Sequence, residues 1–323
     1  MNDGGSLTVQ ECDIEHNYLV YYDNIITGED QLSMYLMGGG IYSENGGAFY
    51  NCKIRNNVIA GKSFYDPVYQ GGGAYARVNT HFNSCLIAGN TIHSDVRDNQ
   101  IIPVCFGGGI YLSDTLLNTC SVRNCAIVGN SISASTNISG DKNFLMIYLY
   151  GGGVYSKMGG TVLNTTIAYN SCIADTVFHQ YGIVAGGILT DQTVVQNCIM
   201  FGNNSYLKEL ENAVFNNNSN NYNAVYDSSN YNRFGAEHIG WIVLAESPFV
   251  ETPSPGNDGI WGTDDDSYGN LRLVKNSACV NAGNPNSVDF DFGSVDYYGN
   301  TRIVDNRIDM GAVEYFLSYN LKG

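Results

Sequence analysis

Four tyrosines stand at matched positions in the sequence and offer surfaces that could contact a sugar ring. Tyr42, Tyr75, Tyr111 and Tyr155 each follow three glycines and one small apolar residue. A tyrosine presents a flat apolar face and a polar hydroxyl, which suit the face and the hydroxyl groups of a sugar. The same spacing would let the rings stack on one another beneath longer loops. The ligand-binding and the structural interpretations therefore both stay open.

A row of charged residues follows two positions after these tyrosines. It contains Glu44, Arg77, Lys157 and Asp191, with Asp114 close to the same position. Two neighbouring carboxylates could hydrolyse a glycosidic bond, but basic residues separate the acidic ones here. We favour a ladder of surface ion pairs, which adds little stability. Contact with a polar ligand through Glu44, Arg77 and Asp114 is the alternative.

An acidic loop between residues 256 and 270 holds Asp258, Asp264, Asp265 and Asp266 among glycines and asparagines. Clustered carboxylate oxygens are ligands that Ca²⁺ prefers, although the spacing is not that of an EF-hand. The loop is predicted to be either a cation-stabilised site or a solvated acidic turn. No cofactor is required by the sequence, and Ca²⁺ is the possible one.

Other signatures of catalysis do not occur in the sequence. The five histidines share no repeat position and no metal-ligand spacing, and there is no nucleophile elbow. The acidic stretch at residues 289–293 is a weaker cation candidate than the loop above. The sequence therefore predicts no catalytic residue. The histidines are His16, His81, His93, His179 and His238.

The tyrosines belong to a repeat that covers roughly the first two thirds of the chain. Six segments follow the pattern C-x-I-x-x-N, with Thr165 replacing one Cys and Met200 one Ile, at steps of 40, 33, 40, 40 and 33 residues. Residues two apart face the same side of a strand, so the Cys and Ile positions are predicted to face a core. The copies begin at Cys12, Cys52, Cys85, Cys125, Thr165 and Cys198.

The final Asn of each copy and the glycine runs are predicted to form turns. Asn tolerates the left-handed conformation and bonds nearby backbone, so the six Asn would stack as an inner ladder at a corner. Glycine permits positive φ and close backbone approach. A phosphate-binding loop would need a following helix and a Lys or Ser/Thr, and neither follows. The runs are Gly38–Gly40, Gly71–Gly73, Gly107–Gly109, Gly151–Gly153 and Ala185–Gly187.

Stacked repeats with two motifs in step predict an all-β, single-stranded, right-handed parallel β-helix. The coils cover residues 1–204. Residues 205–323 are expected to add degenerate coils, a C-terminal completion or cap and an anchor-proximal region to the same solenoid. Each repeat is longer than a minimal coil, and the surplus lies between the Asn and the next glycines. It is therefore predicted to form loop insertions on one face.

The motif cysteines are predicted to be free thiols, which the odd total of nine cysteines also favours. Thr165 occupies a Cys position of the repeat, which a disulfide ladder would not tolerate. Buried free Cys is a common small core residue. The motif cysteines are therefore expected to line the interior without bridging.

Composition excludes several classes of partner. The chain has 323 residues, 31 acidic and 15 basic, and a net charge of −16. Nucleic acid is a poor partner because phosphate binding needs clustered Lys and Arg, and polyanionic glycans are disfavoured for the same reason. No apolar run is long enough for a transmembrane helix. Met1 is not followed by a signal peptide, so we expect the chain to be part of a longer exported precursor.

These motifs resemble right-handed parallel β-helix proteins of the pectate-lyase-like superfamily, and the repeats are similar to those of polymorphic outer-membrane-type proteins. The segments 247–250, 276–284, 296–302 and 309–314 look like the end of bacterial β-helix proteins with a choice-of-anchor Q region. The resemblance covers nearly the whole chain. It implies an exported, surface-associated protein without a defined active site.

The sequence therefore predicts a non-catalytic extracellular or cell-surface protein that binds carbohydrate or a host or matrix ligand. A polysaccharide lyase or glycoside hydrolase of the same fold is one alternative. A structural stalk or adhesin with protein partners is the other. The oligomeric state is left open.

Overall fold

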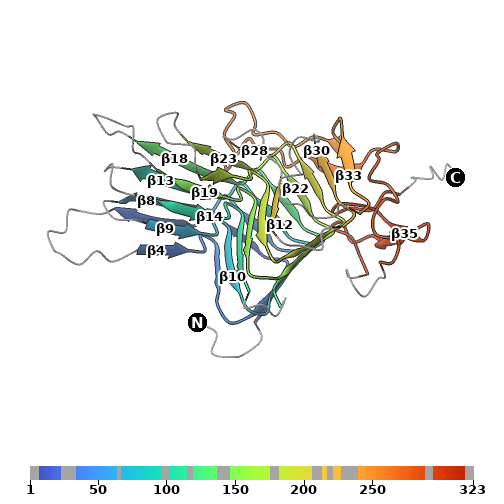
Figure 1. Ribbon diagram of the computed structural model, residues 1–323, viewed down its shortest axis with the longest axis horizontal. Coiled ribbons are helices and arrows are strands. Elements are labelled where there is room, and N and C mark those ends of the chain that lie inside the picture. Colours follow the sequence, from blue (N-terminus) through green and yellow to red (C-terminus); the bar gives the residue numbers. More distant parts are fainter. Residues whose placement is uncertain are drawn as a thin grey trace.

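The computed structural model is an all-β parallel solenoid, as the repeat predicts (Figure 1). It describes residues 7–22, 34–63, 67–96, 102–114, 119–136, 146–174, 182–205, 213–216, 221–226, 239–287 and 294–316. Every regular element in these ranges is a strand. Each coil contributes one strand to each of five parallel sheets, which we name A to E in chain order.

Sheets A, B and E enclose the body of the solenoid. Sheet A contains β1 (Thr8–Gln10), β6 (Gly47–Tyr50), β11 (Thr80–Asn83), β16 (Ser121–Arg123), β21 (Thr161–Leu163) and β26 (Val194–Gln196). Sheet B contains β2 (Asp13–Glu15), β7 (Lys53–Arg55), β12 (Leu86–Ala88), β17 (Ala126–Val128), β22 (Thr166–Ala168), β27 (Ile199–Phe201), β30 (Ala224–Tyr226) and β31 (Ile242–Leu244). Sheet E contains β5 (Ile41–Ser43), β10 (Ala74–Arg77), β15 (Ile110–Ser113), β20 (Val154–Lys157), β25 (Ile188–Asp191) and β29 (Ala213–Asn216).

Sheets C and D form an arm that projects from the body, at the left of Figure 1. Sheet C contains β3 (Tyr18–Tyr22), β8 (Val58–Ser63), β13 (Thr91–Val96), β18 (Ser131–Thr136), β23 (Ser171–Ala174) and β28 (Asn204–Ser205). Sheet D contains β4 (Met34–Met37), β9 (Pro67–Gln70), β14 (Val104–Phe106), β19 (Tyr148–Tyr150) and β24 (Ile183–Val184).

The arm corrects the expectation that the surplus of each repeat forms loops. Most of that surplus is strand, and the two sheets enclose a second core of their own. Ile92, Cys105, Ile132 and Leu149 are fully buried in it. The alternation that marks these strands is short and interrupted by polar residues, so it was not recognised as strand sequence.

The motif Asn residues form the predicted ladder at the corner between sheets B and C. The Asn130 amide, for example, donates to Asn170 Oδ1 at 2.9 Å and to the Ile87 carbonyl at 2.9 Å, and its Oδ1 accepts from Asn90. The left-handed residue is not the Asn itself but the one before it, such as Gly129 at φ 64°. The Asn side chain therefore satisfies the buried turn rather than tolerating strain.

The glycine runs make the facing corner, between sheets D and E. The first residue is left-handed in each run, including Ala185 at φ 59°. A Cβ on the third glycine would collide with the Asn ladder, since on Gly73 it would lie 2.7 Å from Asn90 Nδ2. Two close-packed corners thus form the neck between body and arm, and the third position of each run has room only for glycine.

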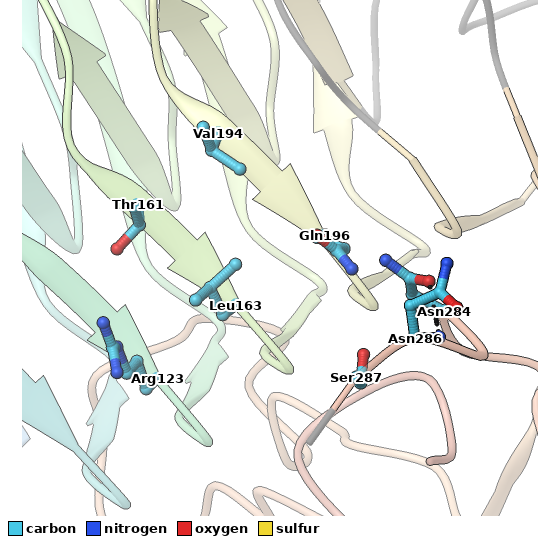
Figure 2. Close-up of a pocket in the computed structure, with 8 residues that line it drawn as sticks. All are labelled: Arg123, Thr161, Leu163, Val194, Gln196, Asn284, Asn286 and Ser287. Carbon is cyan, nitrogen blue, oxygen red and sulfur yellow. Dashed lines mark hydrogen bonds between the residues drawn. The ribbon is translucent and has the colours of Figure 1, made fainter. Parts of the chain in front are cut away.

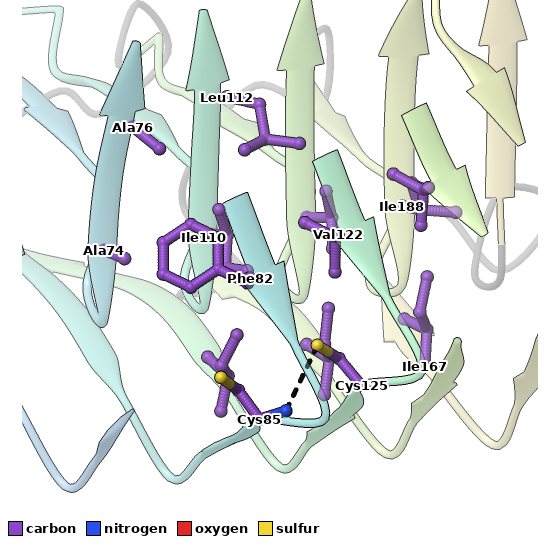
Figure 3. Close-up of a cluster of buried hydrophobic side chains, with 14 of the residues drawn as sticks. Ala74, Ala76, Phe82, Cys85, Ile110, Leu112, Val122, Cys125, Ile167 and Ile188 are labelled. Atoms are coloured by element: carbon purple, nitrogen blue, oxygen red, sulfur yellow. Dashed lines mark hydrogen bonds between the residues drawn. The ribbon is translucent and has the colours of Figure 1, made fainter. Parts of the chain in front are cut away.

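The body core contains the Cys and Ile positions of the repeat, as predicted (Figure 3). Ile87 and Ile127 are fully buried, and so are Cys85 and Cys125. All nine cysteines are free thiols and eight are buried. This confirms the expectation for the motif cysteines, except that Cys12 of the first coil is exposed. The Cys85 thiol donates to the Phe49 carbonyl at 3.3 Å.

The C-terminal segment lies along the outer face of sheet B. β30 and β31 lengthen that sheet. Residues 249–287 and 294–316 then run back over it with two antiparallel strand pairs, β32 (Phe249–Glu251) with β33 (Asn270–Leu273) and β34 (Ile303–Val304) with β35 (Arg307–Ile308). Small residues on sheet B, such as Ala126 and Ala168, pack against Phe249, Leu271 and Met310. The outer face of sheet B is therefore a third core rather than an open surface.

A buried ionic cluster folds the end of this segment. Asp296, Arg302, Asp309 and Glu314 are each at most 2% exposed, and Arg302 pairs with Glu314 at 3.4 Å. Their carboxylates also accept backbone N–H groups, as Asp296 does from Tyr298 at 2.9 Å. The segments 296–302 and 309–314, on which part of the C-terminal resemblance rests, thus contain the buried ionic cluster that holds the end of the chain's C-terminal segment together.

Candidate functional site

The outer faces of sheets D and E meet at a corner lined by aromatic side chains. Sheet E supplies the four repeat tyrosines and sheet D supplies Phe106, Tyr148 and Tyr150. The two faces touch across the corner, with the Phe106 ring 4.6 Å from Tyr155 and 5.9 Å from Tyr111 between centroids. We call this surface the aromatic corner. It runs along the solenoid axis, because each coil adds residues at the same place.

The repeat tyrosines stack face to face along the corner. Ring centroids are 5.1 Å apart for Tyr42 and Tyr75, 5.2 Å for Tyr75 and Tyr111, and 5.4 Å for Tyr111 and Tyr155. The register pairs these residues directly across neighbouring strands. In-register parallel pairing makes this stack unavoidable, since strands lie about 4.8 Å apart. The structural arrangement expected for the four rings is therefore present.

Stacking leaves the four tyrosines with very different access to solvent. Tyr42 is 53% exposed, whereas Tyr75 and Tyr111 are 6% and 4% exposed and Tyr155 is half-buried. Burial raises the pKa of Tyr75 to about 12 and also raises that of Tyr111. A ligand can thus reach an open ring face only at Tyr42, while the inner members present little more than their edges.

The charged pair at the start of the corner is fixed in place. Arg77 forms an ion pair with Glu44, and the Tyr42 hydroxyl donates to the same carboxylate at 2.8 Å. That hydrogen bond to Glu44 is the main cause of the raised pKa of Tyr42. Arg77 and Tyr42 thus hold the Glu44 carboxylate as a hydrogen-bond acceptor at this end of the corner.

Asp114 does not belong to this row. It is 2% exposed, and its carboxylate accepts the backbone N–H groups of Thr119 at 2.5 Å and Cys120 at 2.8 Å. A carboxylate used in this way closes a turn. Asp114 is therefore placed to shape the link between sheets E and A, away from any ligand on the aromatic corner.

The sheet D aromatics were missed in the sequence, although a signal was present. Phe106 and Tyr150 stand directly before the glycine runs, at the last position of β14 and β19. Tyr35 of β4 adds a ring that is 56% exposed at the start of the corner. Aligning the repeats on their glycine runs puts the residue before each run close to the repeat tyrosine after it, and this alignment would have identified Phe106 and Tyr150.

A second hollow lies on the other side of the body, between sheet A and the C-terminal segment (Figure 2). Its volume is about 310 Å³. The C-terminal wall is held by Asn197, whose Oδ1 accepts the Asn284 N–H at 2.8 Å. The hollow is polar but has no cluster of titratable groups among its lining residues. These are Arg123, Thr161, Leu163, Val194, Gln196, Asn284, Asn286 and Ser287.

Carboxylates of the acidic loop accept hydrogen bonds from the loop's own backbone. Asp258 accepts the Ile260 N–H, Asp265 the Asn257 N–H and Asp266 the Gly262 N–H, each at 2.7 Å. The bond to Asn257 is the main cause of the lowered pKa of Asp265. In the residues that the structure describes, no three His, Cys, Asp or Glu side chains converge as metal ligands. Asp264 and the other three carboxylates thus gain no support as a calcium site.

Two of the histidines form pairs on sheet surfaces. His81 Nδ1 lies 2.9 Å from Ser121 Oγ, and His93 Nδ1 lies 2.8 Å from Ser133 Oγ. Both pairs join residues that face each other across neighbouring strands, so they are cross-strand contacts of the sheet. His179, His238 and the stretch 289–293 lie outside the described residues.

The comparisons with known proteins leave the chain without an assigned family. No family model matches it, and no curated protein is significantly similar to it. The described part of the chain also holds no helix with the length and apolar character needed to cross a bilayer.

Proposed function

We propose that this protein is a non-catalytic, extracellular or cell-surface β-helix protein that binds a neutral polysaccharide along the aromatic corner. The supporting observation is the corner itself, in which the sheet E tyrosines stack at strand spacing and exposed or partly exposed rings of sheet D lie beside them. A polymer lying along that axis would meet an open ring face at Tyr42 and partly exposed rings further along. The sequence resemblance to exported pectate-lyase-like proteins supports the same location and ligand class.

The chemistry of the corner fits a neutral ligand better than an anionic one. Tyr35 and Tyr42 offer apolar ring surface, and Tyr148 and Tyr150 are partly exposed on the same side. The nearest charges, Glu44 and Arg77, cancel each other. The chain as a whole carries −16 charges, which repels polyanions before they reach the surface.

Binding to immobilised neutral polysaccharides tests the proposal. Tyr42→Ala should weaken binding about tenfold, which corresponds to about 1.4 kcal/mol for the loss of one stacked ring. Tyr50→Ala is the matched control, because Tyr50 is 38% exposed on sheet A, outside the corner. Tyr75→Phe keeps the buried stack and removes only a hydroxyl, so it should leave binding unchanged.

Three outcomes would contradict the proposal. Equal losses in Tyr42→Ala and Tyr50→Ala would mean that the corner is not the binding surface. Release of shorter sugars from a bound polysaccharide would show an enzyme instead. Failure to bind any glycan, together with retention of a protein partner, would favour the stalk or adhesin alternative.

A further inference from the structure

Residues 294–316, which we call the clasp, attach to the solenoid at the corner between sheets A and B. The Gly311 N–H donates to the Asn197 carbonyl at 2.7 Å, and the Ala312 N–H donates to Thr166 Oγ1 at 3.0 Å. These bonds join the clasp to two neighbouring coils. The clasp is therefore a separate strip of chain that covers the solenoid and adds no strand to its sheets.

The clasp buries more negative than positive charge. Asp296, Asp309 and Glu314 surround Arg302, and all four side chains are at most 2% exposed. Arg302 pairs with Glu314 at 3.4 Å and lies against the Asn164 amide of the corner. Within the described residues, one guanidinium thus faces three carboxylates. Burying an uncompensated charge is costly, so a carboxylate in such a place is expected to bind a proton.

Glu314 is the carboxylate with the least support for a charge. Asp296 accepts three backbone N–H groups and the Asn300 amide, and Asp309 accepts two backbone N–H groups. Glu314 accepts a single backbone N–H, from Asp309 at 3.0 Å, beside its ion pair with Arg302. Hydrogen bonds from N–H groups favour the charged form of a carboxyl. Glu314 is therefore the group that is expected to hold the proton.

The charges around Glu314 all come from the clasp itself. Burial raises the pKa of Glu314 to about 8, Arg302 opposes that rise, and Asp309 and Asp296 add to it. The corner beneath contributes the Cys198 thiol, which acts on Arg302. Loss of the proton from Glu314 thus adds a negative charge to a buried cluster that is already short of positive charge.

We propose that the clasp is a pH-dependent closure, in which loss of the Glu314 proton to solvent detaches residues 294–316 from the corner while the solenoid stays folded. Opening would also loosen the hollow of Figure 2, whose wall residue Asn284 follows Gly283. The Gly283 N–H donates to the Ile308 carbonyl at 2.9 Å, and Arg307 Nε donates to the Gly283 carbonyl at 2.8 Å.

Hydrogen exchange followed by mass spectrometry between pH 6 and 9 tests the proposal on the full chain, with labelling times scaled to the intrinsic exchange rate at each pH. The equilibrium constant for opening of residues 294–316 should rise about a hundredfold over this range, most of it below pH 8. The reason is that the opened clasp releases the proton at the ordinary pKa of a glutamate. β32 and β33 carry no member of the cluster and should keep their protection throughout.

Two conservative variants separate the charge from its place. Glu314→Gln keeps the size of the side chain and cannot ionise, so exchange in the clasp should no longer depend on pH. Glu251→Gln is the matched control, because Glu251 is an exposed carboxylate on β32. It should respond to pH like the wild type.

Three results would overturn the proposal. One is exchange in the clasp that does not change between pH 6 and 9. A second is an equal loss of protection in sheets A and B, which would show unfolding of the whole solenoid. The third is an unaltered pH response in Glu314→Gln. The clasp contacts sheets A and B, whereas the aromatic corner lies on sheets D and E, so glycan binding and clasp opening can fail independently.

Discussion

Replacing Asn130 with Ala should lower the stability of the fold by much more than the small size of the removed side chain suggests, because that side chain is a buried link in the ladder of asparagines. The Asn130 side chain is fully buried and takes part in four hydrogen bonds between 2.9 and 3.0 Å. Its loss leaves the backbone N–H of Asn90 without this acceptor and removes a donor from the Ile87 carbonyl and from Asn170 Oδ1.

The magnitude follows from these contacts. One buried N–H left unsatisfied costs about 1–3 kcal/mol, and each of the remaining bonds contributes about 0.5–1.5 kcal/mol. The expected loss in the free energy of unfolding for Asn130→Ala is therefore about 2.5–7.5 kcal/mol. Asn130→Asp should be at least as damaging, because it turns a donor that faces the Ile87 carbonyl into a buried acceptor.

The end of the ladder provides the control. Asn17 is exposed, and only its amide group donates from the side chain, to Asn57 Oδ1 at 2.8 Å. Asn17→Ala should therefore cost about 1 kcal/mol or less. Urea unfolding followed by far-UV circular dichroism gives both values, and hydrogen exchange at Asn90 reports the local opening. If Asn130→Ala costs no more than Asn17→Ala, the ladder does not stabilise the fold as argued.

Three further predictions concern the C-terminal segment and the thiols. Gly129→Ala should release the C-terminal segment from sheet B, since the new Cβ would lie 2.3 Å from the Trp261 ring. Tryptophan fluorescence should then shift to the red. Gly299→Ala is the control: Gly299 is also at positive φ but has open space around it, so the spectrum should not change. In the native protein Cys12 alone should react with a thiol reagent, because the other eight cysteines are buried; rapid labelling of more than one thiol would contradict the packing. Burial raises the pKa of Glu314 to about 8, so the folded protein binds more protons than the unfolded chain between about pH 4.5 and 8, and stability from this group falls as the pH rises through that range. Glu314→Gln should therefore flatten the dependence of Tm on pH between 5 and 8, and an unchanged slope would contradict the assignment.

The repeat made the body of the solenoid predictable. Residues two apart in a strand face the same side, so Cys85 and Ile87 could be placed in the core, and the residue after each glycine run and its Tyr could be placed on opposite faces. The Asn ladder was also predictable, because a buried turn needs a side-chain partner for its backbone. What the pattern did not give was the left-handed position, which lies one residue before each Asn.

The candidate site was only partly predictable. The four repeat tyrosines share a position, and their stacking follows from parallel in-register pairing. Whether a ring is open depends on neighbours from another sheet, and Phe106 and Tyr150 cover the inner members while Tyr42 remains exposed. The acidic loop shows the same limit, since its composition predicts carboxylate ligands but not the backbone N–H groups that these carboxylates contact.

The sequence by itself determined the coil, because the repeat imposes identical local geometry and neighbouring coils need only stack. Tertiary structure alone decided three things: that the surplus of each repeat is a two-sheet arm, that residues 249–287 and 294–316 cover sheet B, and that sheets D and E meet in an aromatic corner. Each depends on contacts between segments far apart in the chain. Periodicity reports which face of a strand is apolar, but it does not say which other surface will cover that face.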